Sequence, residues 1–441
     1  MKNLVVFLFS LFAIFTAHQV FAQVDFTAMD IAADIGDSRD SITTDFNGDT
    51  FQDIYVANSG NTQNKLWIND GVGNFTANDI AGDLGNSFGA TTADFNGDTF
   101  PDIYVANNAG EQNKLWINDG AGNFTANDIV LEGEEGEETG GNDFGNSRGA
   151  VSADFNDDTF PDIYVANSGG EQNKLWINDG AGNFTANDIV LILGEEEEEP
   201  SGGNDFGDSY DAVAGDINGD TFTDIYTVNN GLFSGEQNKL WINDGAGNFT
   251  ANDIAGDIAY SEGALITDLN EDTFLDIYVA NTGVQNKLWI NDGAGNFTAN
   301  DIAADVRGTD AVSADFDDDD VPDLYVTVIG SQNKLWINDG AGNFTADNIA
   351  IEEEDNSSST VSADFNGDNA SDIYVANISS QQNRLFINNL VIEDGDDSEE
   401  ETEIRSRSRR RSSHRTFTCN DPRAKNYDRF GAHWQSLCLY K

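Results

Sequence analysis

Residues 93–107 read ADFNGDTFPDIYVAN, a short polar loop that runs directly into an apolar strand. The loop places oxygen-bearing side chains at positions 1, 3, 5 and 9, and Gly97 stands at position 4, where a tight turn is needed. Calcium takes about six to eight oxygen ligands, so closely spaced carboxylates, an amide and a backbone carbonyl, here that of Phe100, suit it better than nitrogen or sulfur. The stretch therefore predicts a calcium loop followed by a β-strand.

The same loop occurs seven times, and every copy keeps an oxygen ligand at all four positions. One copy would be a weak indication, because Asp, Asn and Gly also form ordinary turns. Seven copies in register are poorly explained by chance, and we expect about seven Ca²⁺ ions. The predicted metal ligands are Asp45, Asn47, Asp49, Asp53, Asp94, Asn96, Asp98, Asp102, Asp154, Asn156, Asp158, Asp162, Asp216, Asn218, Asp220, Asp224, Asp268, Asn270, Asp272, Asp276, Asp315, Asp317, Asp319, Asp323, Asp364, Asn366, Asp368 and Asp372.

Each loop belongs to a repeat with a fixed order of segments. A segment such as ATTADF enters the loop, DIYVAN leaves it, KLWIN follows after a polar connection, and NFTAND ends the unit. Short apolar segments separated by Gly, Asn and Asp turns are typical of antiparallel strands. The loops begin at residues 45, 94, 154, 216, 268, 315 and 364. Four strands per unit of this length predict an all-β fold, a seven-bladed propeller with four-stranded blades.

The two ends of the repeat region are complementary. An FTA segment at Phe26 precedes the first blade, whereas the last blade ends at RLFINN, residues 384–389, without an FTA segment of its own. We expect the N-terminal strand to complete the seventh blade, which leaves no open sheet edge.

The composition limits the possible functions. The formal net charge is −58 over 441 residues, yet 39% of the residues are hydrophobic and 11% are aromatic, which is enough for a large core. The predicted loops hold 22 of the 79 acidic residues. Nucleic-acid binding needs a basic face and is excluded for this region. The repeat region has no His and no Cys, which excludes Ser-His-Asp, Cys-His and His-based zinc chemistry there, and we expect no enzyme.

The N-terminal segment predicts export. Residues 1–22 carry Lys2, an apolar run and small residues before a cleavage point after Ala22, the pattern of a secretory signal peptide. No later stretch is long and apolar enough to span a bilayer, so a secreted, extracellular or cell-surface protein is expected.

The C-terminal segments differ in composition from the repeats. Residues 391–416 change from acidic to basic and indicate a flexible linker, although the Arg run could instead contact an anionic cell surface or nucleic acid. Residues 417–441 contain Cys419 and Cys438, and the exported context favours a disulfide between them in a small module. This end resembles a Cys-bounded module of exported bacterial proteins, which implies cell-surface attachment or sorting.

The repeats resemble FG-GAP or VCBS repeats, as in the seven-bladed propeller of integrin alpha chains, and define a domain over residues 23–390. DFNGDTFPDIYVAN is similar to the family's calcium loop and second strand, and NDGAGNFT to its turn and outer strand. The resemblance implies that calcium loops and NDGAGN turns share one face, and that a protein or carbohydrate ligand binds the opposite face. Two acidic inserts, Leu131–Asp143 and Leu191–Asp205, enlarge that opposite face as solvated loops or as docking sites for a basic partner or extra cations.

Two sets of side chains have alternative interpretations. The Trp residues of the KLWIN segments could form a sugar-stacking ring, but their constant place in a strand favours packing between neighbouring sheets. The Asn residues of the polar connections, such as Asn58, Asn64, Asn107 and Asn113, could contact a ligand or serve as turn and cap residues.

We therefore predict a secreted propeller that acts as an adhesion or ligand-binding module, in which calcium is mainly structural. A carbohydrate-active enzyme, a lyase or glycosidase, or its accessory domain is the alternative, because paired carboxylates alone can cleave glycosidic bonds. A purely structural component of a matrix or envelope is the third possibility.

Overall fold

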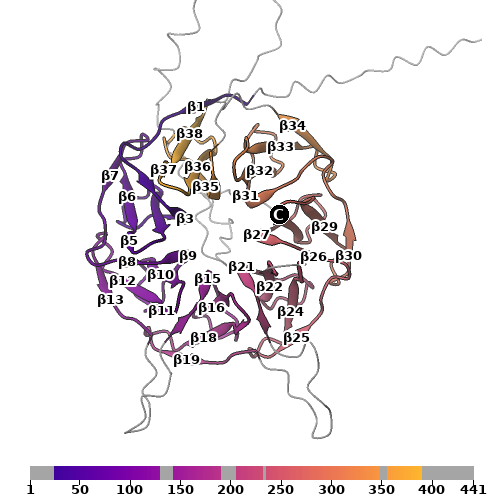
Figure 1. Ribbon diagram of the computed structural model, residues 1–441, viewed down its shortest axis with the longest axis horizontal. Coiled ribbons are helices and arrows are strands. Elements are labelled where there is room, and N and C mark those ends of the chain that lie inside the picture. Colours follow the sequence, from indigo (N-terminus) through magenta and orange to yellow (C-terminus); the bar gives the residue numbers. More distant parts are fainter. Residues whose placement is uncertain (1–23, 130–142, 190–204, 232–234, 348–354, 390–441) are drawn as a thin grey trace, which may run out of the picture. The chain divides into compact units, whose positions relative to one another are not determined.

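A computed structural model describes residues 24–129, 143–189, 205–231, 235–347 and 355–389. In this part of the chain seven four-stranded antiparallel sheets form a ring (Figure 1). The all-β, seven-bladed propeller predicted from the repeats is confirmed. The predicted signal peptide, linker, C-terminal module and Cys pair, and most of both acidic inserts, lie outside the described residues.

Each blade uses one repeat. The innermost strands are β3 (Ser38–Thr44), β9 (Ser87–Ala93), β15 (Ser147–Ala153), β21 (Ser209–Gly215), β27 (Ser261–Thr267), β31 (Gly308–Ala314) and β35 (Ser357–Ala363). The second strands are β4 (Asp53–Asn58), β10 (Asp102–Asn107), β16 (Asp162–Asn167), β22 (Asp224–Asn229), β28 (Asp276–Asn281), β32 (Asp323–Val328) and β36 (Asp372–Asn377).

The third strands are β6 (Lys65–Asn69), β12 (Lys114–Asn118), β18 (Lys174–Asn178), β24 (Lys239–Asn243), β29 (Lys287–Asn291), β33 (Lys334–Asn338) and β38 (Arg384–Asn388). The outer strands are β7 (Phe75–Ala77), β13 (Phe124–Ala126), β19 (Phe184–Ala186), β25 (Phe249–Ala251), β30 (Phe297–Ala299), β34 (Phe344–Asp347) and β1 (Phe26–Ala28).

The ring closes through β1, as the sequence predicts. β1 is the outer strand of the sheet β1-β38-β36-β35 and pairs antiparallel with β38, with Thr27 opposite Ile387. The Phe26 ring also packs edge-on against Phe316 of the sixth blade, at a centroid distance of 6.1 Å. The first described strand therefore holds the last blade in place.

The core lies between neighbouring blades. Every second strand is buried along its whole length, because both faces of each sheet are covered by the next sheet. Tyr55 and Leu66 of the first blade, for example, pack with Ile103, Val105 and Trp116 of the second. All six Trp residues of the KLWIN strands are at most 7% exposed, which confirms packing and excludes a sugar-stacking ring.

The two faces of the ring follow from strand direction. The loops that begin at residues 45, 94 and the equivalent positions join each first strand to the start of its second strand. The NDGAGN turns follow the end of the third strand, which runs antiparallel to the second. Both therefore lie on one face of the ring, here called the calcium-loop face. The connections from second to third strands lie on the opposite face, here called the far face.

On the far face, short two-stranded sheets join neighbouring blades. They pair β5 (Thr62–Gln63) with β8 (Leu84–Gly85), β11 (Glu111–Gln112) with β14 (Phe144–Gly145), β17 (Glu171–Gln172) with β20 (Phe206–Gly207), β23 (Glu236–Gln237) with β26 (Ile258–Ala259), and β2 (Ile35–Gly36) with β37 (Gln381–Gln382). No helix with the length and apolarity of a membrane span occurs among the described residues.

Replacing Thr27 by Pro should open the ring. The Met29 N–H donates to the Leu385 carbonyl at 2.8 Å, and strand alternation then directs the Thr27 N–H towards β38. Proline lacks this donor, so we expect a loss of about 3 kcal/mol in the free energy of unfolding, measured by urea denaturation. Thr27→Ala is the side-chain control. Equal stability of the two variants would contradict closure through β1.

Candidate metal loops and channel mouth

The first carboxylate of each metal loop organises the backbone around itself. In the second loop Asp94 Oδ1 accepts hydrogen bonds from the N–H groups of Gly97 and Asp98, at 2.8 and 3.0 Å. Its Oδ2 accepts from the Thr99 N–H at 2.8 Å. Thr99 has a φ of 79°, a left-handed conformation that is unfavourable for a β-branched residue. The hydrogen bond that its N–H donates to Asp94 helps to hold it there.

The last carboxylate ties the loop to its blade. Asp102 is fully buried, and its two oxygens accept from the Phe95 N–H at 3.0 Å and the Asn118 N–H at 2.8 Å. Burial raises the pKa of Asp102 to about 6, and repulsion from Asp98 and Asp94 adds to this rise. The three predicted acidic ligands are therefore close enough to repel one another, which is the situation that a bound cation would relieve.

The third strand connects each loop to the preceding one. The Asn118 side-chain amide donates to the carbonyl of Phe46, in the first loop, at 2.8 Å. The same bond recurs in every blade, from Asn69 to Phe365, Asn178 to Phe95, Asn243 to Phe155, Asn291 to Ile217, Asn338 to Leu269 and Asn388 to Phe316, at 2.7 to 2.9 Å. We call this set the amide ring; it runs through all seven blades on the calcium-loop face.

Position 3 of the loops distinguishes one copy from the other six. In the second loop the Asn96 amide donates to Asp98 Oδ2 at 2.8 Å, and the five other Asn copies make the same bond at 2.9 to 3.1 Å. The amide thus relieves part of the repulsion between neighbouring carboxylates. In the sixth loop position 3 is Asp317, which has no such donor.

The sixth loop best fits a cation. Carboxylate oxygens of Asp315, Asp317 and Asp323 lie within 4.8 Å of one another. Asp317 is 3% exposed, and its Oδ1 is buried without a hydrogen-bond partner. Burial and the adjacent carboxylates raise the pKa of Asp317 to about 6. An all-oxygen donor set with an unpartnered buried oxygen fits a hard cation such as Ca²⁺.

Every predicted ligand position lies in one of the seven loops on the calcium-loop face.

A second group of residues, most of them polar or charged, lines the central channel. Sequence reasoning missed this group. Each innermost strand has a β-bulge where it pairs with the end of its second strand. The extra residues are Arg39, Phe88, Arg148, Tyr210, Glu262, Thr309 and Ser358, and we call them the bulge ring. Because the bulges lie at the ends of the second strands, the bulge ring surrounds the channel mouth on the far face.

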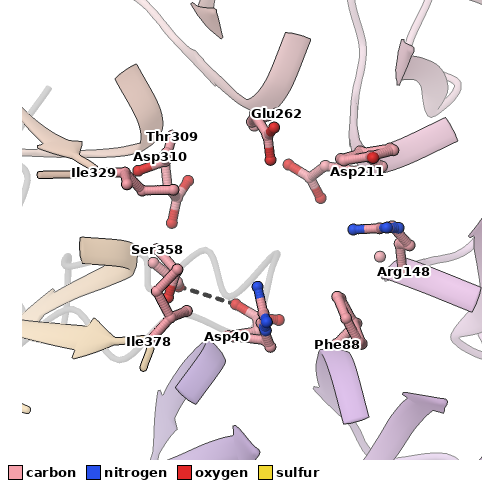
Figure 2. A pocket seen from close by; sticks show the side chains of 15 residues that line it. Asp40, Phe88, Arg148, Asp211, Glu262, Thr309, Asp310, Ile329, Ser358 and Ile378 are labelled. Carbon is pink, nitrogen blue, oxygen red and sulfur yellow. Dashed lines mark hydrogen bonds between the residues drawn. The ribbon is translucent and has the colours of Figure 1, made fainter. Parts of the chain in front are cut away.

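Carboxylates follow the bulge ring in three blades. Asp40, Asp211 and Asp310 come directly after bulged residues, and each accepts a backbone N–H from the next blade: Ala90, Ala264 and Thr360, at 2.8, 3.2 and 3.0 Å. Figure 2 shows these carboxylates and that of Glu262 around one cavity. Burial and mutual repulsion raise the pKa of Asp211 to about 8 and that of Asp310 to about 7.

Two guanidinium groups line the same mouth. The Arg148 guanidinium lies between the rings of Phe88 and Tyr210, with Cζ 4.7 and 3.9 Å from the ring centroids. Arg39 lies over the same Phe88 ring at 4.8 Å and pairs with Asp37 at 3.0 Å. The mouth therefore combines aromatic, cationic and anionic side chains within one cavity.

The Asn residues of the polar connections are internal. Asn58, Asn64, Asn107 and Asn113 are at most 2% exposed. Asn64 accepts from the Asn58 N–H at 2.7 Å and donates to Tyr55 and to Asp83, at 2.9 and 3.0 Å. Ligand contact is therefore excluded for them, and the turn-and-cap interpretation is confirmed.

These Asn residues belong to buried networks with a Tyr and an Asp from the next repeat. Tyr55 donates to Asp83 at 2.6 Å, and Trp116 donates to the other oxygen at 3.0 Å. The Tyr-to-Asp bond recurs at Tyr104–Asp143, Tyr164–Asp205, Tyr226–Asp257, Tyr278–Asp305 and Tyr374–Asp34. Burial raises the pKa of Asp34, Asp83, Asp143 and Asp205 to about 6 in spite of these bonds.

An apolar residue follows each of these buried Asp residues and is directed outwards. The six residues are Ile35, Leu84, Phe144, Phe206, Ile258 and Val306, they are 38% to 57% exposed, and we call them the apolar ring. Strand alternation explains the arrangement, since a buried carboxylate directs its neighbour to solvent. Five members of the apolar ring belong to the short strands on the far face, and the sixth, Val306, forms an isolated β-bridge with Gln285 at the equivalent place. The apolar ring therefore lies on the far face.

Comparison with known families supports the repeat assignment. The sequence matches the family described as FG-GAP-like repeat over residues 45–105, 94–165, 154–227, 268–326 and 315–375, more than half of the chain. No curated protein matches the chain.

Several solved structures share the fold. BBS1N, in a complex with ARL6DN, is 12% identical, with 84% of this chain and 99% of that chain covered and a TM-score of 0.52. YCF48 from Cyanidioschyzon merolae is 11% identical, with 82% and 98% covered and a TM-score of 0.51. An Agrocybe aegerita lectin that recognises terminal N-acetylglucosamine is 19% identical, with 81% and 87% covered and a TM-score of 0.49. At these identities the similarity concerns the fold alone.

Exchanging Asn and Asp at position 3 should change stability in opposite directions. In metal-free protein Asp317→Asn should raise the free energy of unfolding by about 1 to 2 kcal/mol. The change removes a buried carboxylate oxygen that has no partner, and it supplies the side-chain amide that donates to the position-5 carboxylate in the other six loops. Asn96→Asp should lower it by a similar amount. Added calcium should stabilise Asn96→Asp more, and Asp317→Asn less, than the parent in urea denaturation. Equal calcium increments in all three proteins would contradict metal binding at these loops.

Metal-free protein should be more stable at pH 5 than at pH 8. The pKa values of Asp34, Asp83, Asp143 and Asp205 are raised on folding, so their contribution is complete below the unfolded value near 3.8 and is lost as pH rises through about 6. We expect the melting temperature in chelator-treated buffers to fall by more than about 5 °C across this range. Asp83→Asn should reduce the fall. A melting temperature that rises from pH 5 to pH 8 would contradict the raised pKa values.

Proposed function

Because this chain belongs to the FG-GAP-like repeat family, we propose that its propeller is an exported, calcium-stabilised module that binds a protein or carbohydrate ligand on the far face. The observation that carries this proposal is the apolar ring. Its six large side chains are exposed in one circle around the channel mouth, and groups of exposed apolar residues on a soluble protein commonly mark interaction sites. The fold is compatible with this use, since BBS1N is described in a complex with another protein.

Calcium would act through the seven loops and not through the ligand site. The residues that would hold it are the four predicted side chains of each loop, with Asp315, Asp317, Asp319 and Asp323 as the most acidic set. Bound calcium supplies positive charge that offsets the repulsion between these carboxylates. The loops lie at the opposite end of the second strands from the apolar ring, so we assign calcium a structural role.

A carbohydrate-active enzyme is the second candidate. It is favoured by the channel carboxylates, since burial and repulsion raise the pKa of Asp211 to about 8, which would keep a proton on this group at neutral pH beside other carboxylates. A protonated and an ionised carboxyl group are the pair that glycoside hydrolysis requires. Against it, both Asp211 oxygens accept backbone N–H groups, from Ala212 at 2.8 Å and Ala264 at 3.2 Å, which gives this side chain a structural role between blades.

Binding to glycan and matrix-protein arrays tests the proposal. We expect the mature chain to bind a specific class of ligand without releasing product, and Leu84→Ser combined with Phe206→Ser to weaken binding at least about tenfold by removing apolar contact area. Val72→Ser is the matched control, because Val72 is 60% exposed in a turn on the calcium-loop face. Chelator should lower the melting temperature.

Three results would contradict the proposal in different ways. Release of product from a polysaccharide would favour the enzyme. Equal loss of binding in Val72→Ser would place the ligand elsewhere. Absence of binding on both arrays would favour a purely structural protein.

A further inference from the structure

Among the strand positions of the repeat, the bulge ring varies most. The second strand reads DIYVAN in five of the seven blades, and the third reads KLWIN in six. The seven bulged residues, in contrast, comprise two Arg, two aromatic residues, one Glu and two hydroxyl residues. β-Bulges commonly redirect side chains beside functional sites. The variety at one structural position indicates a site with two different sides.

One side contains a guanidinium that lacks an acceptor. Arg148 Nε is buried without a hydrogen-bond partner, and no carboxylate lies within 4.0 Å of the Arg148 nitrogens among the described residues. The rings of Phe88 and Tyr210 cover its two faces, so only its N–H edge can bind a partner. In Figure 2 its nitrogens point into the cavity. A planar guanidinium edge is the preferred partner of a carboxylate.

The other side contains carboxylates that make no direct ion pair, and Glu262 feels Arg148 and Arg39 only as charges that partly offset the rise in its pKa on burial. Glu262, Asp211, Asp310 and Asp40 point into the same cavity (Figure 2), and none has a Lys or Arg nitrogen within 4.0 Å among the described residues. Within the described part of the chain, Glu262 accepts a single hydrogen bond, from the Asn230 amide at 3.1 Å. Buried carboxylates without a counter-charge are costly, and an ammonium group would compensate them.

The scaffold keeps these opposite charges apart. Arg148 is fixed by its aromatic neighbours, and Asp211 by the N–H groups of Ala212 and Ala264. The cavity that both sides line has a volume of about 120 Å³, well above the ~10–15 Å³ that a single water needs on this measure, so it has room for a small molecule. A ligand with both charges would satisfy both sides.

We propose that the channel mouth binds a small zwitterion, an α-amino acid or a molecule of the same type, whose carboxylate pairs with Arg148 and whose ammonium faces Glu262. Phe88 and Tyr210 position the guanidinium. An anion alone would meet the four carboxylates, and a cation alone would leave Arg148 unpaired. This inference rests on the proposed function, because it names a ligand class for the far face.

Calorimetry and thermal shift on the full mature chain test the inference. The probes are the twenty L-amino acids, followed by the amide and the N-acetyl derivative of the best binder, which lack the carboxylate and the ammonium charge. We expect binding of at least one amino acid and an affinity at least about tenfold lower for each derivative. Arg148→Gln and Glu262→Gln should each weaken binding at least about tenfold. Lys114→Gln, which alters a rim ion pair with Asp128, should not.

The outcomes separate this inference from the proposed function. No shift with any of the twenty amino acids overturns it, and so does an amide or an N-acetyl derivative that binds as tightly as its parent. Unchanged affinity in a folded Arg148→Gln or Glu262→Gln protein also overturns it, with folding checked by an unaltered melting temperature. Array binding that persists in Arg148→Gln but is lost in the apolar-ring variant would leave the proposed function intact while removing the zwitterion site.

Discussion

The amide ring makes the seven metal loops and the seven blades one mechanical unit. Each third-strand Asn, such as Asn118, spans two blades: its N–H donates to the last carboxylate of its own loop, and its side-chain amide donates to a carbonyl in the preceding loop. A loop cannot change shape without disturbing both blades. Charge repulsion within a loop is therefore transmitted to the interface between sheets, where most of the apolar core lies. This coupling explains how small acidic turns can determine the stability of a large ring.

Much of this fold could be predicted because its information is local and repeated. The loop spacing, the strand segments and the unmatched FTA segment at Phe26 specify the blade number and the closure through β1. The Trp residues were also interpretable, since a constant strand position indicates packing. The amide ring was not predictable, because Asn118 and Phe46 are far apart in the chain and Asn in such a segment reads as an ordinary turn residue.

The channel mouth was missed for a different physical reason. A bulge adds one residue and breaks the two-residue alternation, so Arg148 and Glu262 cannot be assigned to a face from sequence. The buried Asp residues were missed because an Asp beside a glycine, such as Asp83 after Gly82, is typical of an exposed turn. Asp83 is not a surface charge but a buried acceptor for Tyr55, Asn64 and Trp116. The large acidic content of this chain is thus partly internal, and burial with repulsion keeps several of these groups at raised pKa.

Under the proposed function, the two faces divide stability and recognition between different residues. On the calcium-loop face the repeats are nearly identical, because each loop must satisfy the same contacts to its own blade and to the preceding one. On the far face the bulged residue is the extra one in its strand pair, so its side chain can vary without changing the ladder on either side. A sevenfold scaffold can therefore carry an asymmetric site at its axis. Divergence is concentrated where the fold does not depend on it, and a ligand-specific arrangement of Arg148, Glu262 and their neighbours can arise there without weakening the ring.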